Sequence, residues 1–308
     1  MQQHSNRAFI AILLLVNLFS GMQIYGQASK PNGGSIVRIE KFPARNVLPR
    51  KVEVWLPDNY DSTKKYSVLY MNDGQNLFDS TLTWNKQEWK VDESMTALLA
   101  ANKIRRCIVV AIWNVNQTRT TDYFPAKPLR LLDASLLKNL VDSEFGGNMM
   151  GDAYLKFLVT ELKPYIDTHF STLRDQEHTF IAGSSKGALS ALYAICEYPG
   201  IFGGAACLST HWVGSTRFPN VQIPQVLLRY LKDNLPSPAN HRIYFDYGTE
   251  ELDSLYEPFQ LLADDLMKER GFKKSKNWTT VKCKGETHNE RAWRKRFPDA
   301  MEFIMNER

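Results

Sequence analysis

The sequence lacks the patterns that mark metal and cofactor sites. Its 308 residues include only four cysteines and six histidines, and no two cysteines form a C-x-x-C pair. There is no H-E-x-x-H motif and no glycine-rich loop of the kind that cradles phosphate groups. We therefore expect neither a metal ion nor a cofactor.

Long runs of like charge, internal repeats and extended linkers are also absent. The net charge of +5 is small for this length, and no five consecutive residues carry the same sign. Nucleic acid is therefore not predicted as a partner. Hydrophobic residues make up 44% and charged residues 23%, as in an ordinary globular protein. The length is enough for one large α/β domain or two small ones.

The cysteines lie inside apolar stretches at 107, 196, 207 and 283. This pattern predicts buried free thiols. An oxidising compartment would permit one disulfide, and the sequence does not indicate which pair would form it.

The N-terminal segment has the pattern of a secretory signal. Arg7 supplies a positive charge ahead of an apolar stretch at 8–19, which is short for a membrane span, and small residues follow at 26–28. We predict a signal peptide over 1–27 and a single domain over 28–308. The protein would then be periplasmic or secreted, with no stable membrane anchor after cleavage. An uncleaved anchor is the alternative.

Short apolar runs and helical segments alternate along the rest of the chain. Eight strands are predicted, at 35–40, 51–57, 66–71, 107–113, 178–183, 203–209, 242–248 and 278–283. Helical patterns are predicted at 152–166, 187–198, 224–233, 257–271 and 290–297. The alternation predicts an α/β fold with a mostly parallel central sheet and helices on both faces. The first two strands have no helix between them, so an antiparallel start is expected.

A G-x-S-x-G motif, Gly183 to Gly187, joins the strand at 178–183 to a helix rich in small residues. A tight strand-to-helix turn of this kind exposes the central serine, here Ser185, as a nucleophile. The helix N-terminus offers backbone N–H groups to a developing oxyanion, and we expect that of Lys186 to contribute. A plain small-residue turn is the alternative interpretation.

A nucleophilic serine needs a general base, which in this architecture comes last in chain order. His288, in "CKGETHNERAW", follows the last predicted strand and is the preferred candidate. His211 follows another strand and is the alternative base; otherwise we expect it to line the pocket.

The acid that orients the base should follow the strand at 242–248, in the loop "GTEELDSLY". Asp253 is preferred, Glu251 is second, and Glu250 stays open. Each could instead be a solvated carboxylate that caps a helix. Asp246 lies inside the strand and is predicted to be structural.

A second oxyanion donor is expected from the loop "MNDGQNLFD" after the third strand. Gly74 permits a tight turn there, so the N–H of Gln75 is the candidate, and Asp73 of the same loop is a candidate for substrate binding. An Asp-Gly turn without further function is the alternative.

Other strand-end residues are candidates for substrate binding. Trp113 and Trp212 are core residues by default, but they lie just past strand ends and could instead form an aromatic wall. Arg119 could bind substrate or simply pair with Asp122. The other tryptophans considered are also predicted to be core: Trp84, Trp89, Trp278 and Trp293.

Four separated stretches, "VLYMNDGQNLFD", "IAGSSKGALSALYA", "IYFDYGTEELD" and "GETHNERAW", together resemble the putative esterase (esterase D-like) family of α/β-hydrolases. That family includes enterochelin esterases and family 1 carbohydrate esterases such as feruloyl and acetylxylan esterases. The resemblance runs from about residue 35 to the end. It implies an α/β-hydrolase fold with Ser185 as nucleophile, His288 as base and a carboxylate from 250–253.

The chain departs from this family directly after the serine. Family members commonly carry Met and Gly there, whereas this chain has Lys186 and Gly187. The lysine could contact an anionic part of a substrate or point to solvent.

The motifs together predict an exported serine esterase that hydrolyses acyl esters, acetyl or feruloyl, of carbohydrates. Its partner would be a small-molecule or oligosaccharide ester. A siderophore lactone esterase of the enterochelin type is the alternative, and a non-catalytic carbohydrate-binding protein on the same fold is a second. The residues do not separate hydrolysis from acyl transfer, and the oligomeric state stays open.

Overall fold

A computed structural model describes residues 31–217 and 219–306. The predicted signal peptide, 1–27, lies outside the described residues. The fold is built on one eight-stranded sheet with the strand order β1-β2-β4-β3-β5-β6-β7-β8. Its strands are β1 (Ser35–Phe42), β2 (Arg50–Leu56), β3 (Ser67–Asn72), β4 (Cys107–Ile112), β5 (Thr179–Ser184), β6 (Gly204–Leu208), β7 (Arg242–Gly248) and β8 (Trp278–Cys283).

All eight predicted strands are present, with ends shifted by at most two residues. β2 pairs antiparallel with both β1 and β4, which confirms the expected antiparallel start. The pairings from β4 through β3 to β8 are parallel. The central strands β3, β4 and β5 are buried along their whole length, as continuous apolar runs predict for strands covered on both faces.

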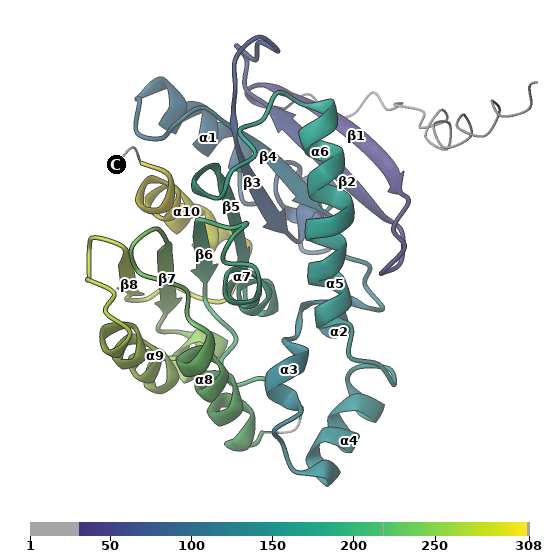
Figure 1. Cartoon of the computed structure of the whole chain (residues 1–308), viewed down its shortest axis with the longest axis vertical. Coiled ribbons are helices and arrows are strands. Elements are labelled where there is room, and N and C mark those ends of the chain that lie inside the picture. The colour runs from purple at the N-terminus through teal and green to yellow at the C-terminus, as the bar shows by residue number, and fades with distance from the viewer. Residues whose placement is uncertain (1–30, 218, 307–308) are drawn as a thin grey trace, which may run out of the picture.

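Helices cover both faces of the sheet (Figure 1). One face packs against α1 (Val91–Ala100) and α10 (Glu290–Met305). The other face packs against α5 (Gly151–Phe157), α6 (Lys163–His169), α7 (Lys186–Glu197), α8 (Gln222–Asn234) and α9 (Glu257–Glu269). The predicted α/β architecture with a covered, mostly parallel sheet is confirmed.

Three helices follow β4 as an excursion from the sheet, toward the lower right of Figure 1. They are α2 (Arg119–Tyr123), α3 (Ala126–Leu129) and α4 (Ala134–Ser143). The sequence analysis did not predict these helices or α1. Its last helix, predicted at 290–297, continues to Met305 although Pro298 lies inside it.

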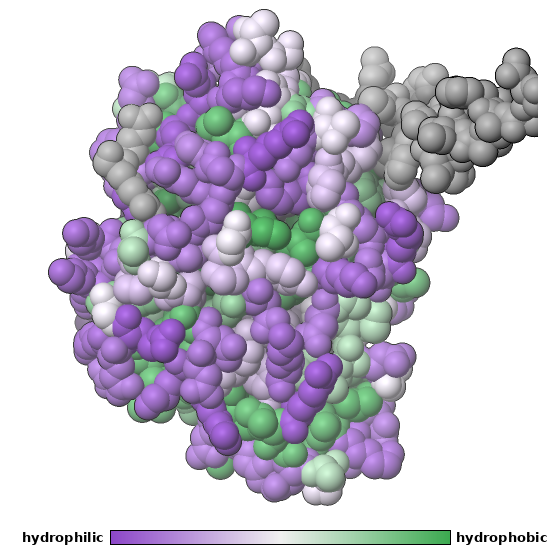
Figure 2. Space-filling view, in the orientation of Figure 1, coloured by the Kyte–Doolittle hydropathy of each residue, from purple (hydrophilic) through white to green (hydrophobic). Residues whose placement is uncertain are grey.

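The described surface is mostly hydrophilic in the view of Figure 2. Hydrophobic residues gather toward the bottom of that view, where Figure 1 places α3, α4 and α8. Among residues 31–217 and 219–306, no helix has the length and apolar character that crossing a membrane requires. All four cysteines are free thiols, as predicted; three are buried, whereas Cys283, also expected to be buried, is half-buried.

Candidate active site

The turn that carries Ser185 joins β5 to α7. Ser185 has φ 56° and ψ −124°, a backbone conformation that non-glycine residues rarely adopt. Its N–H donates to the carbonyl of Leu208 over 3.0 Å, so the neighbouring strand helps to hold the turn. A Cβ at Gly183 would lie 2.6 Å from the carbonyl carbon and oxygen of Gly187, which explains the first glycine of the motif, and a Cβ at Gly187 would lie 3.2 Å from Cβ of Asn72.

His288 lies in the loop between β8 and α10. Its Nδ1 is 2.5 Å from Oδ1 of Asp253, and its ring meets the edge of Trp293 with the centroids 5.0 Å apart. The next residue, Asn289, caps α10 by accepting a hydrogen bond from the N–H of Ala292. The cap and the indole ring therefore set the position of the imidazole.

Asp253 lies in the short helical turn η5 (Glu251–Leu255) after β7 and is completely buried. Its Oδ2 accepts from the N–H of Gly248 and from Oγ of Ser209, each over 2.6 Å. Burial alone would raise the pKa of this carboxyl, but the hydrogen bonds from His288, Ser209 and Gly248 hold it below its usual value. Asp253 is therefore an ionised partner of the imidazole, and its reading as a solvated cap is wrong.

Glu251, the second candidate for the acid, is exposed. It begins η5 in a left-handed conformation, with φ 52°. Glu250 is also exposed, and its carboxylate accepts from Oγ1 of Thr249. Of the three carboxylates left open by the sequence, the structure brings only Asp253 to His288.

The neighbours of Ser209 determine which group its hydroxyl can donate to. Nε1 of Trp293 and Nη2 of Arg296 both donate to its Oγ, each over 2.9 Å. Indole and guanidinium groups can only donate, so the single hydroxyl proton of Ser209 is left for Asp253. The sequence analysis did not single out Ser209, and its position directly after β6 is the only signal that could have indicated it.

Asp246 lies inside β7 beneath this network and is fully buried. Its Oδ1 accepts from the N–H of Ser209 over 3.1 Å and lies 3.4 Å from Nη1 of Arg296. Burial raises its pKa to about 6, although the charge of Arg296 opposes the shift. These contacts agree with the structural role predicted for Asp246.

His211 also lies beside the nucleophile. Its N–H donates to the carbonyl of Ser185 over 3.4 Å, and its Nδ1 is 2.8 Å from Oη of Tyr256. Burial, together with the charges of Lys186, His288 and Arg119, lowers its pKa to about 3, so the ring is neutral near pH 7.

Tyr256 connects these groups. Its buried phenol hydrogen-bonds His211 and lies beside the side chain of Ser185, and its ring meets that of His288 with the centroids 5.8 Å apart. Ser185, His211 and His288 therefore all lie around Tyr256, and of the two histidines only His288 has a carboxylate partner.

The predicted oxyanion loop follows β3 and begins with Asp73, whose φ is 58°. A Cβ on Gly74 would lie 2.7 Å from the backbone of Ala111 and Ile112, so only glycine allows this loop to lie against β4. Among the described residues, the N–H groups of Gln75 and Lys186 have no hydrogen-bond acceptor. Two backbone donors are thus left available, one on each side of the nucleophile turn.

Arg119 pairs with Asp73 rather than with Asp122. Its Nε and Nη2 donate to the two carboxylate oxygens of Asp73 over 2.7 and 2.8 Å, and Asn114 adds a third hydrogen bond of 2.6 Å. Asp122 instead accepts from Arg50 over 3.1 Å. The predicted alternative of an Arg119–Asp122 pair is therefore wrong, and Asp73, 6% exposed, is occupied by protein groups.

The burial of three tryptophans decides between the core and the surface. Trp212 is 1% exposed and donates to Oε1 of Gln260 over 2.9 Å, so it is a core residue and not part of an aromatic wall. Trp113 is half-buried, donates to Glu53 and lies under the ammonium group of Lys51. Trp84, predicted to be core, is 88% exposed.

Trp84 lies on a loop that is fastened to the start of α10. The amides of Asn85 and Asn76 donate to the two carboxylate oxygens of Glu290 over 2.7 and 3.2 Å. Glu290 is 6% exposed and follows His288 by two residues. The exposed indole therefore belongs to a segment that is bound beside His288.

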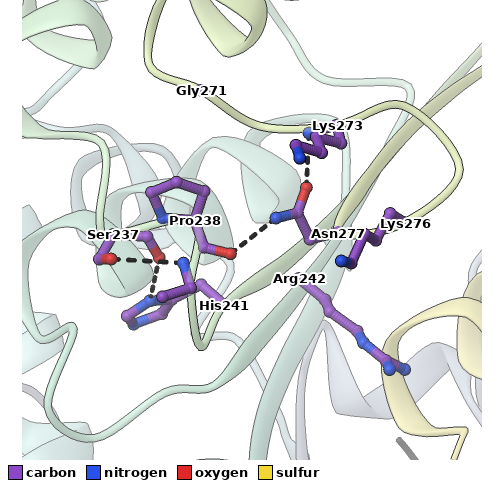
Figure 3. A pocket seen from close by; sticks show the side chains of 9 residues that line it. Ser237, Pro238, His241, Arg242, Gly271, Lys273, Lys276 and Asn277 are labelled. Carbon is purple, nitrogen blue, oxygen red and sulfur yellow. Dashed lines mark hydrogen bonds between the residues drawn. The ribbon is translucent and has the colours of Figure 1, made fainter.

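A hollow of about 540 Å³ lies at the other edge of the sheet, before β7 and β8 (Figure 3). His241 forms part of its lining and is 3% exposed. Its ring nitrogens lie 2.8 Å from the carbonyl oxygens of Ser237 and Pro199, and its Nε2 also lies 2.8 Å from Nε2 of Gln176. None of the candidate catalytic residues lines this hollow.

Within the described part of the chain, His, Cys, Asp and Glu side chains form no group of three or more that could hold a metal ion.

The strand order and the turn after β5 define the α/β-hydrolase fold, which solved structures share. A ferulic acid esterase superposes with a TM-score of 0.62 at 18% identity, covering 88% of this chain and 97% of its own. The enterobactin esterase FES from Shigella flexneri gives 0.60 at 17% identity, covering 86% of this chain and 57% of its own.

Sequence comparison identifies the family. Residues 48–304 match the Esterase family, described as Putative esterase, and the chain belongs to this family. A relative, the uncharacterized protein YbbA from Bacillus subtilis (strain 168), is 23% identical over 262 residues, which cover 83% of this chain and 92% of that protein.

Proposed function

We propose that the protein is a serine hydrolase of carboxylic esters, with Ser185 as nucleophile, His288 as general base and Asp253 as the acid that orients it. The observation that carries the proposal is the 2.5 Å contact between His288 and the buried Asp253, beside Tyr256, which also neighbours Ser185. A carboxylate on Nδ1 keeps the proton off the other ring nitrogen, which is then free to accept one.

The first half of the reaction forms an acyl-enzyme. His288 takes the proton of Ser185 while Oγ attacks the ester carbonyl, and Asp253 stabilises the imidazolium that results. The tetrahedral intermediate collapses, the C–O bond to the alcohol breaks, and the alcohol leaves with the proton from His288.

The second half of the reaction clears the acyl group. His288 removes a proton from water, the hydroxide attacks the acyl carbonyl, and the bond to Ser185 breaks as its oxygen regains the proton. The products are a carboxylic acid and an alcohol, so one water is consumed for each ester.

The oxyanion that forms in both halves needs preorganised donors. The N–H groups of Gln75 and Lys186 have no acceptor among the described residues, which supports their assignment to this role. The Arg119–Asp73 pair holds the loop that carries Gln75, so we assign these two side chains to positioning that loop. Removing one such donor typically costs about 2.7–4 kcal/mol of transition-state stabilisation.

We assign the substrate to acyl esters of carbohydrates. Trp84 supports this assignment because a solvent-exposed indole provides a flat apolar face for a ligand ring, and here amide groups lie beside it. The fold shared with a ferulic acid esterase agrees with it. The N-terminal segment supports export, so we place the protein in the periplasm or outside the cell.

A siderophore lactone esterase is the second candidate. The observation in its favour is the cationic side of the pocket, where Lys186 and Arg119 lie close enough to influence the pKa of His211. The fold shared with an enterobactin esterase agrees with this candidate.

Fluorophosphonate labelling of the mature protein tests the nucleophile. We expect one adduct, located on Ser185 by mass spectrometry, and none in Ser185→Ala. The neighbouring Ser184→Ala variant is the matched control and should label normally. Turnover by Ser185→Ala should fall by a factor of about 10⁴–10⁶.

Absence of an adduct in folded wild-type protein would contradict the proposal and favour a binding protein on this fold. With labelling established, acetylated and feruloylated oligosaccharides and a catechol trilactone separate the two substrate classes. Higher kcat/KM on the trilactone would overturn the carbohydrate assignment.

A further inference from the structure

Lys186 occupies the position directly after Ser185 and is the first residue of α7. Its side chain is half-buried and reaches α2, where Nζ donates to Oγ1 of Thr120 over 3.1 Å. The ammonium group therefore does not extend into solvent. It is held against the segment that also carries Arg119.

No carboxylate among the described residues forms an ion pair with Lys186. Glu144 attracts it, but the carboxylate of Glu144 accepts a hydrogen bond from Ser215 and lies outside ion-pair distance of Lys186. Burial, together with repulsion from Arg119, lowers the pKa of Lys186. Burial and the charge of Arg119 thus both disfavour the protonated form of Lys186.

The other groups nearby do not supply the missing anion. Asp73 is fully engaged by Arg119 and Asn114, and His211 is neutral near pH 7. A buried cation is normally paired because desolvation is costly. The residue directly after the nucleophile is therefore a cation without an anionic partner among the described residues.

We propose that Lys186 binds a carboxylate group of the ester substrate, and so selects for esters that carry a negative charge close to the reacting carbonyl. The proposal rests on the proposed function. A carboxylate is favoured over a catechol because it is fully ionised near pH 7, whereas a phenol with a pKa of about 10 is not.

Matched pairs of esters, one carboxylate and one carboxamide of the same shape, test the proposal. One pair places the group on the acyl half, as the mono-4-nitrophenyl esters of terephthalic acid and of its monoamide. The other pair places it on the alcohol half, as a monoacetylated methyl glucuronide and the corresponding glucuronamide. The measured quantity is the ratio of kcat/KM for the charged ester to that for the neutral ester.

We expect the wild-type ratio to be about 10- to 100-fold in the pair that matches the natural substrate, the range given by a charged hydrogen bond. In Lys186→Met the ratio should fall to about one. Because the ratio compares two esters on one variant, any change in the shared oxyanion donor cancels. Lys186→Arg should keep the preference, and Lys232→Met, which removes an exposed positive charge elsewhere, should leave it unchanged.

The ratio should also depend on salt and pH. Raising ionic strength to about 0.5 M should lower it, because a partly exposed pair is screened. The preference for the charged ester should disappear as the pH rises and Lys186 loses its proton, because the neutral amine carries no charge. Since the pKa of Lys186 is lowered, this loss should occur at a lower pH than it would for an exposed lysine.

A wild-type ratio near one in both pairs, or a preference that persists in Lys186→Met, would overturn the proposal. Failure of the proposed function looks different, because then the neutral esters are not hydrolysed and Ser185 is not labelled.

Discussion

The two edges of the sheet differ in where they place strained backbone and buried charge. At the carboxyl edge, a buried non-glycine residue with positive φ directly follows each of β3, β5 and β6: Asp73, Ser185 and Ser209. At the amino edge, the corresponding positive-φ residues Asn102 and Ser275 are exposed. Strain on an exposed turn is easily accommodated, whereas strain on a buried polar residue persists only where the surrounding contacts hold it.

Buried charged residues also distinguish the two edges. Asp246, Asp253 and Arg296 are buried at or below the carboxyl edge, and each contacts the network around Ser209. The hollow at the amino edge is lined instead by exposed lysines and by His241, whose partners are two backbone carbonyl groups and the side-chain amide of Gln176, all uncharged. The comparison indicates that the carboxyl edge is built for chemistry and the amino edge for stability.

The largest effect should come from Asp253→Asn. The asparagine keeps the shape but not the charge, so His288 loses the group that sets its tautomer, and kcat should fall by a factor on the order of 10⁴. Glu251→Gln is the matched control and should stay close to wild type, because Glu251 is exposed. Steady-state kinetics on an aryl acetate measures both. Loss of activity in Glu251→Gln with normal activity in Asp253→Asn would assign the acid to Glu251.

A smaller effect should come from Ser209→Ala, which removes one donor to Asp253 and leaves Trp293 and Arg296 without their acceptor. We expect kcat/KM to fall about 10- to 100-fold, the range for a hydrogen bond to a charged group. Ser67→Ala is the control, since this buried serine at the start of β3 has a hydroxyl without a partner in the described structure.

The pH profile separates a positioning role for Ser209 from a loss of packing. The hydrogen bond from Ser209 helps to hold the pKa of Asp253 low, so its removal should raise that pKa. Asp253 then becomes protonated at a higher pH, so the acid limb of the kcat/KM profile of Ser209→Ala should shift to higher pH. An unchanged profile with lower stability alone would show that Ser209 is only structural.

The depressed pKa of Asp253 also links it to stability. A carboxyl whose folded pKa lies below its unfolded value contributes stability above the unfolded pKa and loses it as pH falls through the folded pKa. The stability difference between wild type and Ser209→Ala should therefore shrink when unfolding is measured at progressively lower pH.

The smallest effect on catalysis should come from the amino edge. His241→Phe removes the contacts of a buried ring with the carbonyl groups of Ser237 and Pro199 and with the side chain of Gln176, and should lower the free energy of unfolding by about 1–3 kcal/mol. Its kcat should match wild type. Denaturant unfolding and kinetics on the same preparation measure both quantities, and a marked loss of kcat would break the contrast between the two edges.

The fold was largely predictable because its signals are local. Short strand-like runs located all eight strands within two residues, and the elbow motif located the turn at Ser185. The excursion after β4 was not predicted from the sequence. α2 and α3 span only five and four residues, too few to show a helical period. α4 does carry an apolar stripe, since Leu136, Leu137, Leu140 and Val141 pack toward the core, and this signal was missed.

Pairing across the sheet was less predictable. Arg119 was considered with Asp122, three residues along the chain, but its partner is Asp73, because β3 lies beside β4. Trp212, a candidate for an exposed aromatic wall, is buried, and Trp84, predicted to be core, is exposed, for a similar reason. Whether an indole is covered depends on what packs over the loop that carries it, and the local sequence does not contain that information.

The sequence by itself determined the strands, their alternation with helices, and a serine, a histidine and an acidic loop in the order that this fold requires. Only the tertiary structure decided which carboxylate meets His288, that Ser209 must donate its proton to Asp253, and that Lys186 is unpaired beside the nucleophile. The reason is physical: strand propensity and turn chemistry act over a few neighbouring residues. Hydrogen-bond direction and charge compensation depend on groups brought together from β5, β6, β7 and α10.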